Sequence, residues 1–398
     1  MVCGYRPTPS GGGTEKYVYE LTRGLLRRGV AVDVICEDRA FLPDEENPLA
    51  EHIVGLDPRS LHGGSLVEQF AEKSRRFAEL LDPARYDVVH CHGQYGYHLA
   101  LSCAARVKRP RLISGFHLTA QGPNERYARL GLGEPDEAAV DRAVALMESA
   151  MAVLSDRCIA VSQGVAQELV ELYSVPPERI DVIYNWYDPS VFFPTRRQIA
   201  RRLLHLETEG RYLLYVGHFN MSRGKIMLDV MRRLPPDVTL IVAHHKPDEA
   251  ICAELGSRVR FTGHLTPQKM TLHYSAVDLL CFPSLYAGFG LVLIEAMACG
   301  CPPVVFDYPA MNELVTDASG YLVPDPTPSS FAAAVQMALR DGRKKALAAR
   351  GRAASFVMSE QIEKVLRTYG AAGGEKTMAA VATRNPVSIT FVTDMKLL

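Results

Sequence analysis

The sequence predicts an α/β protein with two domains, each built around a parallel sheet. A chain of 398 residues is too long for one ordinary hydrophobic core, so two domains are expected. Short apolar or β-branched runs alternate with amphipathic helical stretches almost throughout, which is typical of parallel α/β sheets. The alternation stops at "WYDPSVFFPT", residues 186–195, where two prolines indicate a linker, and then restarts.

The predicted elements follow from this alternation. In the first half, strands are expected at "MVCGY", "VAVDVIC", "YDVVHC", "RLISGFH", "RCIAVS" and "RIDVIY". Apolar residues at helical spacing predict helices such as "TEKYVYELTRGLLRRG" and "EQFAEKSRRFAELL". After the linker, strands are expected at "RYLLYVG", "VTLIVA", "RVRFTG", "DLLCFP" and "PPVVFD", and a helix runs through "EQIEKVLRTYG".

These patterns set the expected domain boundaries. We expect one parallel α/β domain over residues 1–188 and a second over residues 189–355. A helix over 356–372 should pack back toward the N-terminal domain. The tail, residues 373–398, ends in the strand-like "VSITFVTDMKLL" and is not assigned a structure. Because parallel sheets bind ligands beyond the carboxyl ends of their strands, two facing domains predict a cleft between them.

Composition and charge exclude several classes of protein. Hydrophobic residues make up 47% and charged residues 22%, which is typical of a soluble globular protein. A formal net charge of -1 argues against a dedicated nucleic-acid binder. The basic clusters "KSRR", "RVKRPR" and "RRQIARR" are more typical of solvated helix faces, although weak peripheral contact with an anionic membrane surface is the alternative.

The expected location is cytoplasmic, with the inner face of the membrane as the alternative. The N-terminus "MVCGYRPTPSGG" lacks the charged and apolar regions of a signal peptide, and the most apolar run, 290–306, is broken by Glu295, Gly300 and two prolines. The nine cysteines are scattered without a framework, which favours buried reduced thiols.

Two glycine turns precede helices, one in each half. Gly11, Gly12 and Gly13 follow the first strand; there the backbone could approach a phosphate or sugar, but a flexible turn without a ligand explains the triplet equally well. In the second half, "SLYAGFG" follows a strand and opens the helix "LVLIEAMAC".

The second turn predicts a diphosphate site with a carboxylate beside it. Gly288 and Gly290 permit a tight turn, and the first-turn N–H groups of Leu291 and Val292 would lack helical acceptors. With the positive end of the helix dipole, these groups could hold a diphosphate. Glu295 lies one turn further on, where it could accept hydrogen bonds from ribose hydroxyls.

A third segment supplies positive charge. The loop "GHFNMSRGK" follows a predicted strand and offers His218, Arg223 and Lys225, which could stabilise a negatively charged leaving group. An ordinary polar loop is the alternative interpretation. His90 with His92, and His244 with His245, lack a convincing third ligand, so no metal site is expected. Tyr95, Tyr97 and residues 119–135 are candidates for lining a ligand site by location alone.

Taken together, these residues resemble the retaining glycosyltransferases of family four, of the glycosyl transferase group 1 type. The resemblance covers about residues 2–370 and depends on the order and spacing of seven segments. These are "GGGTEKYVYELTRGLLRRG", "YDVVHCHG", "CIAVSQGVAQEL", "VPPERIDVIYNWYD", "YVGHFNMSRGK", "VRFTGHL" and "GFGLVLIEAMACGCPPVV".

The resemblance implies a fold, a reaction and a set of site residues. The fold would be GT-B, with two facing Rossmann-like domains, parallel sheets and an interdomain cleft. Residues 1–188 would form the acceptor domain and residues 189–355 the nucleotide-sugar domain. The reaction would move a sugar from a nucleotide-diphosphate sugar to a hydroxyl of a glycan, lipid or small natural product, with retained configuration. It would need no metal and no cofactor besides the donor substrate. The acceptor and the oligomeric state are not indicated.

The implied roles fall on particular residues. His117 matches a histidine that contacts the donor sugar near the reacting carbon and is the catalytic candidate. Glu295 would contact the ribose. The remaining donor-binding candidates are Gly12, Gly13, His218, Arg223, Gly288, Phe289, Gly290, Leu291 and Val292.

Several positions depart from the family pattern. Ala287 stands where the family usually has a glutamate that touches donor-sugar hydroxyls, and His218 stands where it has a phosphate-binding arginine. Arg223 keeps the charge of a usual lysine, and Trp186 replaces a usual glycine. "MVCGY" is short for a first strand that is central in this architecture, and a misassigned start is one explanation.

Two alternatives to an active transferase remain open. Ala287 and His218 are compatible with a catalytically impaired homologue that binds a nucleotide sugar or supports a partner transferase. An epimerase or hydrolase acting on a nucleotide sugar with the same fold would need a dedicated acid/base pair, for which only His117 is well placed.

Overall fold

The chain folds into two units, which are described separately. Unit 1 comprises Met1–Asn185 and Met358–Leu397, and unit 2 comprises Trp186–Val357. The computed structural model describes residues 2–3, 7–8, 12–37, 49–57, 64–129, 138–217, 222–243, 249–370 and 388–392.

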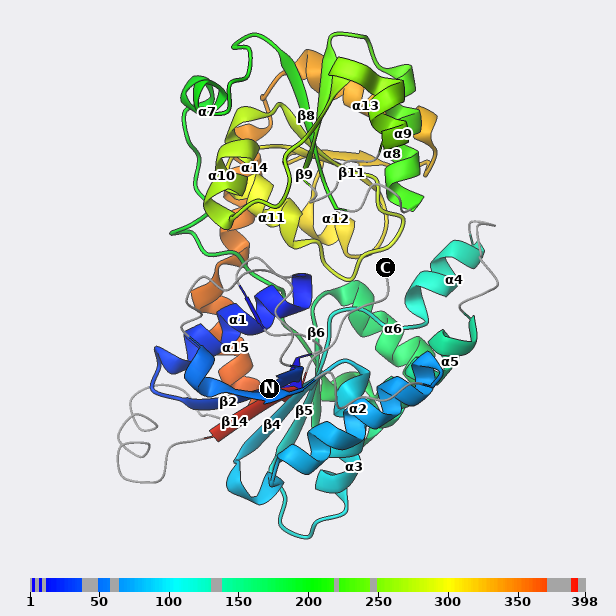
Figure 1. Cartoon of the computed structure of the whole chain (residues 1–398), viewed down its shortest axis with the longest axis vertical. Helices are drawn as coiled ribbons and strands as arrows, with labels where there is room; N and C mark the ends of the chain where they lie inside the picture. Colours follow the sequence, from blue (N-terminus) through cyan, green and yellow to red (C-terminus); the bar gives the residue numbers. More distant parts are fainter. Residues whose placement is uncertain are drawn as a thin grey trace. The chain divides into compact units, whose positions relative to one another are not determined.

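Unit 1 is a parallel sheet with helices on its faces (Figure 1). Its strands are β1 (Val2–Cys3), β2 (Ala31–Glu37), β3 (Ile53–Leu56), β4 (Val88–His92), β5 (Arg111–Phe116), β6 (Arg157–Ala160), β7 (Ile180–Val182) and β14 (Ser388–Val392). Its helices are α1 (Gly13–Leu26), α2 (Leu66–Leu80), α3 (Tyr97–Ala104), α4 (Gly122–Arg129), α5 (Ala138–Leu154), α6 (Gln163–Tyr173) and α15 (Met358–Thr368). The structure thus assigns a strand to the tail, which the sequence left unassigned, and adds β3, which was not predicted.

The place between β2 and β4 is shared by strands from the two ends of the chain. In β14, Ser388–Phe391 pair with residues 31–34 of β2, and Ile389–Val392 pair with residues 88–91 of β4. Val2 and Cys3 of β1 pair with Ile35 and Cys36, further along β2. Because β3 occupies the other side of the same residues of β2, β1 and β14 lie end to end on one side of it. The short first strand is therefore continued by the C-terminal segment.

Local sequence explains the helices that frame this sheet. Ser65 begins α2 with a capping box, in which its hydroxyl accepts from the N–H of Glu68 and the Glu68 carboxylate accepts from the N–H of Ser65. Gly24 of α1 leaves room for α15, because a Cβ there would lie 2.0 Å from Cδ1 of Ile362. The Arg28 side chain donates to the carboxylate of Glu363 at 2.9 Å across the same contact.

Unit 2 is a six-stranded parallel sheet in the order β10-β9-β8-β11-β12-β13. Its strands are β8 (Arg211–Val216), β9 (Val238–Ala243), β10 (Val259–Phe261), β11 (Leu279–Phe282), β12 (Pro303–Phe306) and β13 (Tyr321–Val323). Its helices are α7 (Arg197–Leu203), α8 (Ser222–Arg233), α9 (Glu249–Leu255), α10 (Pro267–Ala276), α11 (Leu291–Ala298), α12 (Met311–Leu314), α13 (Pro328–Asp341) and α14 (Ala346–Ala353). The edge strand β13 was not predicted.

A buried ion pair joins the start of unit 2 to its sheet. Arg201 of α7 is 1% exposed; its guanidinium pairs with Asp278 at 3.1 Å and donates to the carbonyl of Ala276 at 2.8 Å. Asp278 also accepts from the N–H of Tyr212 at 2.8 Å. Trp186, which replaces a usual glycine of the family, is buried in this unit. Because removing one partner would leave a buried charge, this contact fixes α7 to the strands.

The described residues contain neither a membrane-spanning helix nor a disulfide. No helix among them combines the length and the apolar character that crossing a bilayer requires. The cysteine side chains described there are all free thiols, most of them buried.

The strand β14 gives the first prediction. Deleting residues 373–398 would leave the ladder groups of β2 and β4 unpaired in the interior of the sheet, where Val89 and Val34 are fully buried. We expect the truncated chain to lose at least about 10 °C in Tm or to become insoluble. Circular dichroism melting and gel filtration measure this.

The matched pair for this prediction is Thr390→Pro and Thr390→Val in the full chain. Proline removes a ladder N–H, whereas valine keeps it and suits a strand. The proline variant should melt well below the valine variant. If the wild type, both variants and the truncated chain all had the same Tm, β14 would contribute nothing to the stability of the sheet.

Candidate active site

The topology of unit 2 identifies where a ligand would bind. From β8, the chain adds β9 and β10 on one side and β11, β12 and β13 on the other. Ligands of open parallel sheets bind beyond the carboxyl ends of the strands, where the strand order reverses. The segments following β8 and β11 flank this point. The segment after β8 begins at Gly217, and His218 lies outside the described residues.

The turn after β11 presents the predicted donor groups. Gly290 precedes α11 with φ +102°, a left-handed conformation that favours glycine, and a Cβ there would lie 3.0 Å from Cδ1 of Leu293. The N–H of Leu293 donates to the carbonyl of Gly290 at 3.0 Å. Among the described residues, the N–H groups of Leu291 and Val292 find no acceptor. The start of α11 therefore offers two open donors at the positive end of the helix dipole.

The other predicted residues of unit 2 that the structure describes lie in the same turn or in α8. Gly288 and Phe289 are buried, and the Phe289 ring packs edge-on against Phe356, with 5.9 Å between ring centroids. The Phe289 side chain thus anchors the turn, and a donor contact from its backbone stays a prediction. Arg223 is the second residue of α8, and its side chain is not described. Ala287 is half-buried between Tyr286 and Gly288.

Glu295 is buried one turn below the start of α11 and is not alone. It is 4% exposed, and the hydroxyl of Tyr274 in α10 donates to its Oε2 at 3.0 Å. Burial, followed by the negative charge of Glu295, raises the pKa of Tyr274 well above its usual value. The sequence analysis missed Tyr274. The only signal was that a carboxylate in an apolar run needs a hydrogen-bond donor; which residue supplies it depends on how α10 packs against α11.

In unit 1, the start of α1 carries the other predicted glycines. Gly12 precedes the helix, Gly13 is its first residue, and both are exposed. The carboxylate of Glu15 covers Gly12, because a Cβ at residue 12 would lie 2.6 Å from its Oε2. Thr14 is 1% exposed, and its hydroxyl has no hydrogen-bond partner among the described residues. A negative group thus already lies beside this helix end, and contact of Gly12 and Gly13 with a donor phosphate stays a prediction.

His117 belongs to a cluster of three histidines, His90, His92 and His117. Nδ1 of His92 lies 3.1 Å from Nε2 of His117, and the His90 and His92 rings are 4.0 Å apart between centroids. Nδ1 of His90 hydrogen-bonds the hydroxyl of Tyr369 at 2.7 Å. Gly115 makes room for the cluster, because a Cβ there would lie 2.6 Å from Nδ1 of His92 and 2.8 Å from Nε2 of His90. The three-histidine cluster therefore requires glycine on the neighbouring strand.

The histidines of this cluster are neutral at neutral pH. Burial lowers the pKa of His90 and His92 well below the usual value and lowers that of His117 to about 3. Between two neutral rings, one nitrogen of the His92–His117 contact carries a hydrogen and donates, and the other accepts. The tautomer of His92 therefore determines which nitrogen of His117 carries hydrogen. Among the described residues, no group of three histidine, cysteine or acidic side chains has the arrangement to hold a metal ion.

Two carboxylates hold the segment that follows His117. Oε2 of Glu148 accepts from the hydroxyl of Tyr173 at 2.6 Å and from the N–H of Ala120 at 2.9 Å. The hydroxyl of Thr119 donates to Glu168 at 2.7 Å. Burial raises the pKa of Glu148 to about 7. This carboxyl group therefore titrates near neutral pH while it holds the backbone at Ala120.

The expectation that Tyr95 lines a ligand site is wrong. Its side chain is 4% exposed and lies in the core, where it packs edge-on against Phe70 and Phe77. The ammonium group of Lys73 lies 4.4 Å from the centroid of its ring. Tyr95 is thus part of the packing of α2 on the sheet, which its position directly after β4 did not reveal.

Comparison with known proteins agrees with this arrangement. The model of "Glycosyltransferase Family 4" matches residues 11–191, and that of "Glycosyl transferases group 1" matches residues 210–341. A D-inositol 3-phosphate glycosyltransferase from Geodermatophilus obscurus is 29% identical over 404 residues, covering 94% of this chain and 87% of that protein. Together the two models cover well over half of the chain.

Solved structures show the same fold. Sucrose-phosphate synthase from Thermosynechococcus elongatus matches with a TM-score of 0.76 at 22% identity, covering 94% of this chain and 99% of that one. Anabaena Alr3699/HepE in complex with UDP-glucose matches with a TM-score of 0.70 at 20% identity, covering 93% and 99%. The fold is therefore GT-B, and the molecule is a glycosyltransferase. The chain belongs to glycosyltransferase family 4.

The three-histidine cluster gives the second prediction. Each buried neutral histidine is protonated more readily when unfolded, so stability is present above about pH 6.5 and is lost as pH falls below it. The loss is about 1.4 kcal/mol per pH unit for each histidine. Between pH 6.5 and 5, urea unfolding should show a shallower pH dependence for His117→Gln than for the wild type, by about this amount.

Comparing His117→Gln with the wild type isolates the contribution of His117 to the pH dependence of stability. Glu148 has the opposite pH dependence: because its pKa is raised, its contribution to stability is lost as pH rises from about 4.5 to 7. This contribution is the same in the wild type and in His117→Gln, so it cancels in the comparison. The control is His205→Asn in unit 2, where the exposed His205 has φ +52°, which asparagine tolerates. If His117→Gln and the wild type had the same slope, the neutral state of His117 would be excluded.

Proposed function

We propose that this glycosyltransferase takes its sugar from a nucleotide-diphosphate sugar and transfers it with retained configuration to a hydroxyl acceptor, without a metal ion. The observation that carries the donor part is the start of α11. Two open N–H groups, on Leu291 and Val292, lie at the reversal point of the sheet. Glu295 is buried one turn below them. The first feature suits a diphosphate and the second suits ribose hydroxyls.

The relatives indicate which substrates to test first. HepE is described in complex with UDP-glucose, and the curated relatives are named for D-inositol 3-phosphate. A UDP-sugar is therefore the first donor and an inositol phosphate the first acceptor to test. Glycans, lipids and small natural products remain further acceptor classes, because the fold accommodates many acceptors.

The charge state of His117 favours transfer over epimerisation or hydrolysis. With a pKa of about 3, the imidazole is neutral at assay pH and is a poor general acid. It can still donate or accept a hydrogen bond with a sugar hydroxyl through the nitrogen that does not contact His92. Charge on the departing diphosphate would then be stabilised from unit 2, by Arg223 and His218 together with the start of α11.

A catalytically impaired homologue is the second candidate function. Ala287 leaves the turn after β11 without the carboxylate that the family usually carries there. Losing a group that stabilises developing charge costs on the order of a hundredfold in rate. Such a protein would bind a nucleotide sugar and turn it over slowly, or would support a partner transferase. Rapid turnover by the isolated chain would exclude this function.

The third prediction tests donor binding. UDP, GDP and ADP are titrated by calorimetry, and at least one should bind and raise Tm. Glu295→Ala should weaken that binding about tenfold, because a hydrogen-bonded buried carboxylate is lost. Tyr274→Phe should weaken it less, because the carboxylate remains and loses only one partner. Glu209→Ala, at an exposed glutamate of the same unit, should have no effect.

Two results would contradict this assignment. Binding of none of the three nucleotides would remove the donor site, and equal affinity of Glu295→Ala and wild type would remove the ribose role of Glu295. Urea unfolding of each variant establishes that the mutated unit is folded.

The fourth prediction separates an impaired enzyme from an adapted one. If the missing carboxylate limits the rate, Ala287→Glu should raise kcat with UDP-glucose by up to about a hundredfold, whereas the uncharged Ala287→Gln should not. Initial rates of UDP release with an identified acceptor measure this. A slower Ala287→Glu enzyme would show instead that Ala287 fits a donor that lacks the corresponding hydroxyl.

A further inference from the structure

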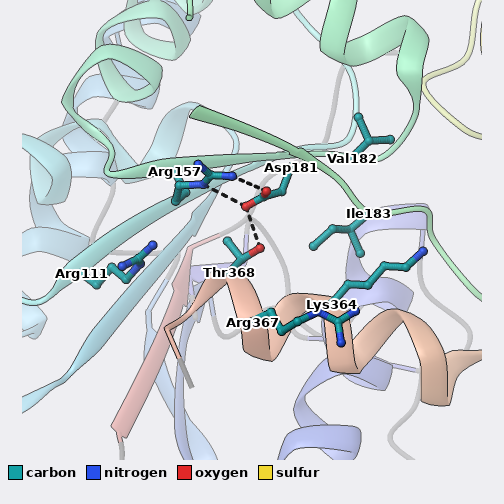
Figure 2. A pocket seen from close by; sticks show the side chains of 8 residues that line it. All are labelled: Arg111, Arg157, Asp181, Val182, Ile183, Lys364, Arg367 and Thr368. Carbon is teal, nitrogen blue, oxygen red and sulfur yellow. Dashed lines mark hydrogen bonds and ion pairs between the residues drawn. The ribbon is translucent and has the colours of Figure 1, made fainter. Parts of the chain in front are cut away.

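Unit 1 has a pocket of about 400 Å³ at the amino ends of β5 and β6 (Figure 2). Arg111 and Arg157 are the first residues of these strands, and Lys364 and Arg367 come from the last turns of α15. Val182 and Ile183 form an apolar part of the wall. The volume lies in the range of small-molecule sites.

One of the four cations is already neutralised. Arg157 forms a two-pronged ion pair with Asp181, with its Nε 3.0 Å from Oδ2. Oδ2 of Asp181 also accepts from the hydroxyl of Thr368 at 2.8 Å. Both oxygens of this carboxylate are therefore engaged, and Asp181 has little capacity left for the other cations.

The other three cations have no ion-pair partner among the described residues, and the acidic group that interacts with Arg111 at a distance is Asp156, which is itself paired with Arg109. Among the described residues, Arg111, Lys364 and Arg367 form no ion pair. The ammonium group of Lys364 donates to the neutral amide oxygen of Gln361 at 3.1 Å. Four cations and one carboxylate give this pocket a net charge of +3.

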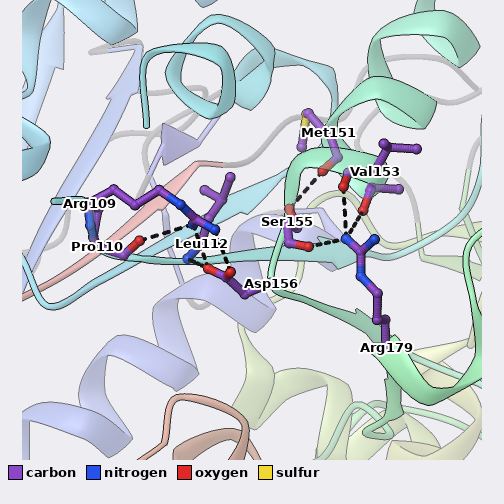
Figure 3. Close-up of polar contacts among 9 residues, drawn as sticks. Arg109, Pro110, Leu112, Met151, Val153, Ser155, Asp156 and Arg179 are labelled. Carbon is purple, nitrogen blue, oxygen red and sulfur yellow. Dashed lines mark hydrogen bonds and ion pairs between the residues drawn. The ribbon is translucent and has the colours of Figure 1, made fainter. Parts of the chain in front are cut away.

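Two neighbouring arginines at this edge of the sheet do find carboxylate or carbonyl oxygens as hydrogen-bond acceptors. Figure 3 shows Arg109 paired with Asp156 at 2.7 and 2.6 Å. Arg179 donates to the carbonyls of Ala152 at 3.0 Å and Val153 at 2.9 Å, and thereby caps the end of α5. The absence of an ion-pair partner for these three cations is therefore a property of the pocket.

The pocket is remote from the histidine cluster. Arg111 begins β5 and His117 follows its last residue, so the strand separates them by about 20 Å at about 3.3 Å per residue. Arg111 and Arg157 lie at the amino ends of their strands, whereas parallel sheets bind their substrates at the carboxyl edge; within the lining, Val182 and Ile183 extend to the carboxyl end of the edge strand β7. It therefore does not belong to the candidate active site.

We propose that this pocket binds a phosphate-bearing molecule whose doubly charged phosphate group pairs with Arg111, Arg367 and Lys364. Arginine forks match phosphate oxygens in pairs, and a dianion compensates three cations better than a single carboxylate does. The apolar wall formed by Val182 and Ile183 accommodates a carbon-containing part of the molecule. The site is separate from the proposed donor site and does not depend on it.

The test uses the full chain and measures how fast Lys364, a residue of the pocket, is acetylated. Lysine acetylation is followed by mass spectrometry in the presence of inorganic pyrophosphate, or of phosphatidylglycerol or phosphatidylcholine vesicles. Pyrophosphate should slow acetylation of Lys364 at least about threefold and leave the exposed Lys108 of the same unit unchanged. Protection by phosphatidylglycerol vesicles alone would identify the phosphate group as that of a lipid.

The variants decide whether the proposed cations are responsible. Arg111→Gln with Arg367→Gln should raise the concentration of pyrophosphate, or of vesicles, needed to protect Lys364 at least about tenfold. Arg85→Gln, an exposed arginine of the same unit, is the matched control and should bind like the wild type. Absence of protection by any of these probes, or protection at an unchanged concentration after the double substitution, would overturn the proposal. Because Lys364 reports only this pocket, failure here leaves the donor site untouched.

Discussion

The ladder between β2 and β4 is the constraint on which the first unit depends. Parallel strands pair along both edges, so a sheet with an empty central position would bury unpaired N–H and C=O groups. Residues 388–392 occupy most of that position and Val2–Cys3 complete it. The neighbour on one side is β4, in which His90 lies in register with Phe391. The three-histidine cluster, and with it His117, is thus placed by a strand from the far end of the sequence.

In the second unit, the turn after β11 and the first two turns of α11 carry the groups proposed for donor binding. A helix start that leaves two N–H groups open is stable only if something polar can reach them, and the turn after β11 keeps that end accessible with glycine at residue 290. The same helix then buries Glu295 one turn later, where Tyr274 donates to one of its oxygens. Opposite hydrogen-bonding characters thus lie one helical turn apart, which is the pattern that a diphosphate joined to a ribose would match.

Periodicity and turn chemistry predicted most of the architecture but not its long-range contacts. The strands of four or more residues in unit 2, the glycine turn before α11 and the helix through "EQIEKVLRTYG" were all readable, because local patterns decide them. The strands β3 and β13 were missed because each has only three or four residues and contains or follows a glycine, in "IVGL" and "GYLV", so no longer apolar run marks it. The partners Tyr274 for Glu295 and Gly115 for the histidines depend on which elements become neighbours, and the cations of the pocket come from strands and a helix that are far apart in the chain.

The place of β14 also orders events during synthesis. Residues 388–392 are translated after all of unit 2, so the central ladder of unit 1 cannot close until unit 2 has been synthesised. Until then the nascent first unit carries open strand edges on β2 and β4, the kind of edge that pairs readily with other chains. Unit 2 is continuous in sequence and can finish first. The unit that begins first in the sequence is therefore the one whose sheet is completed last.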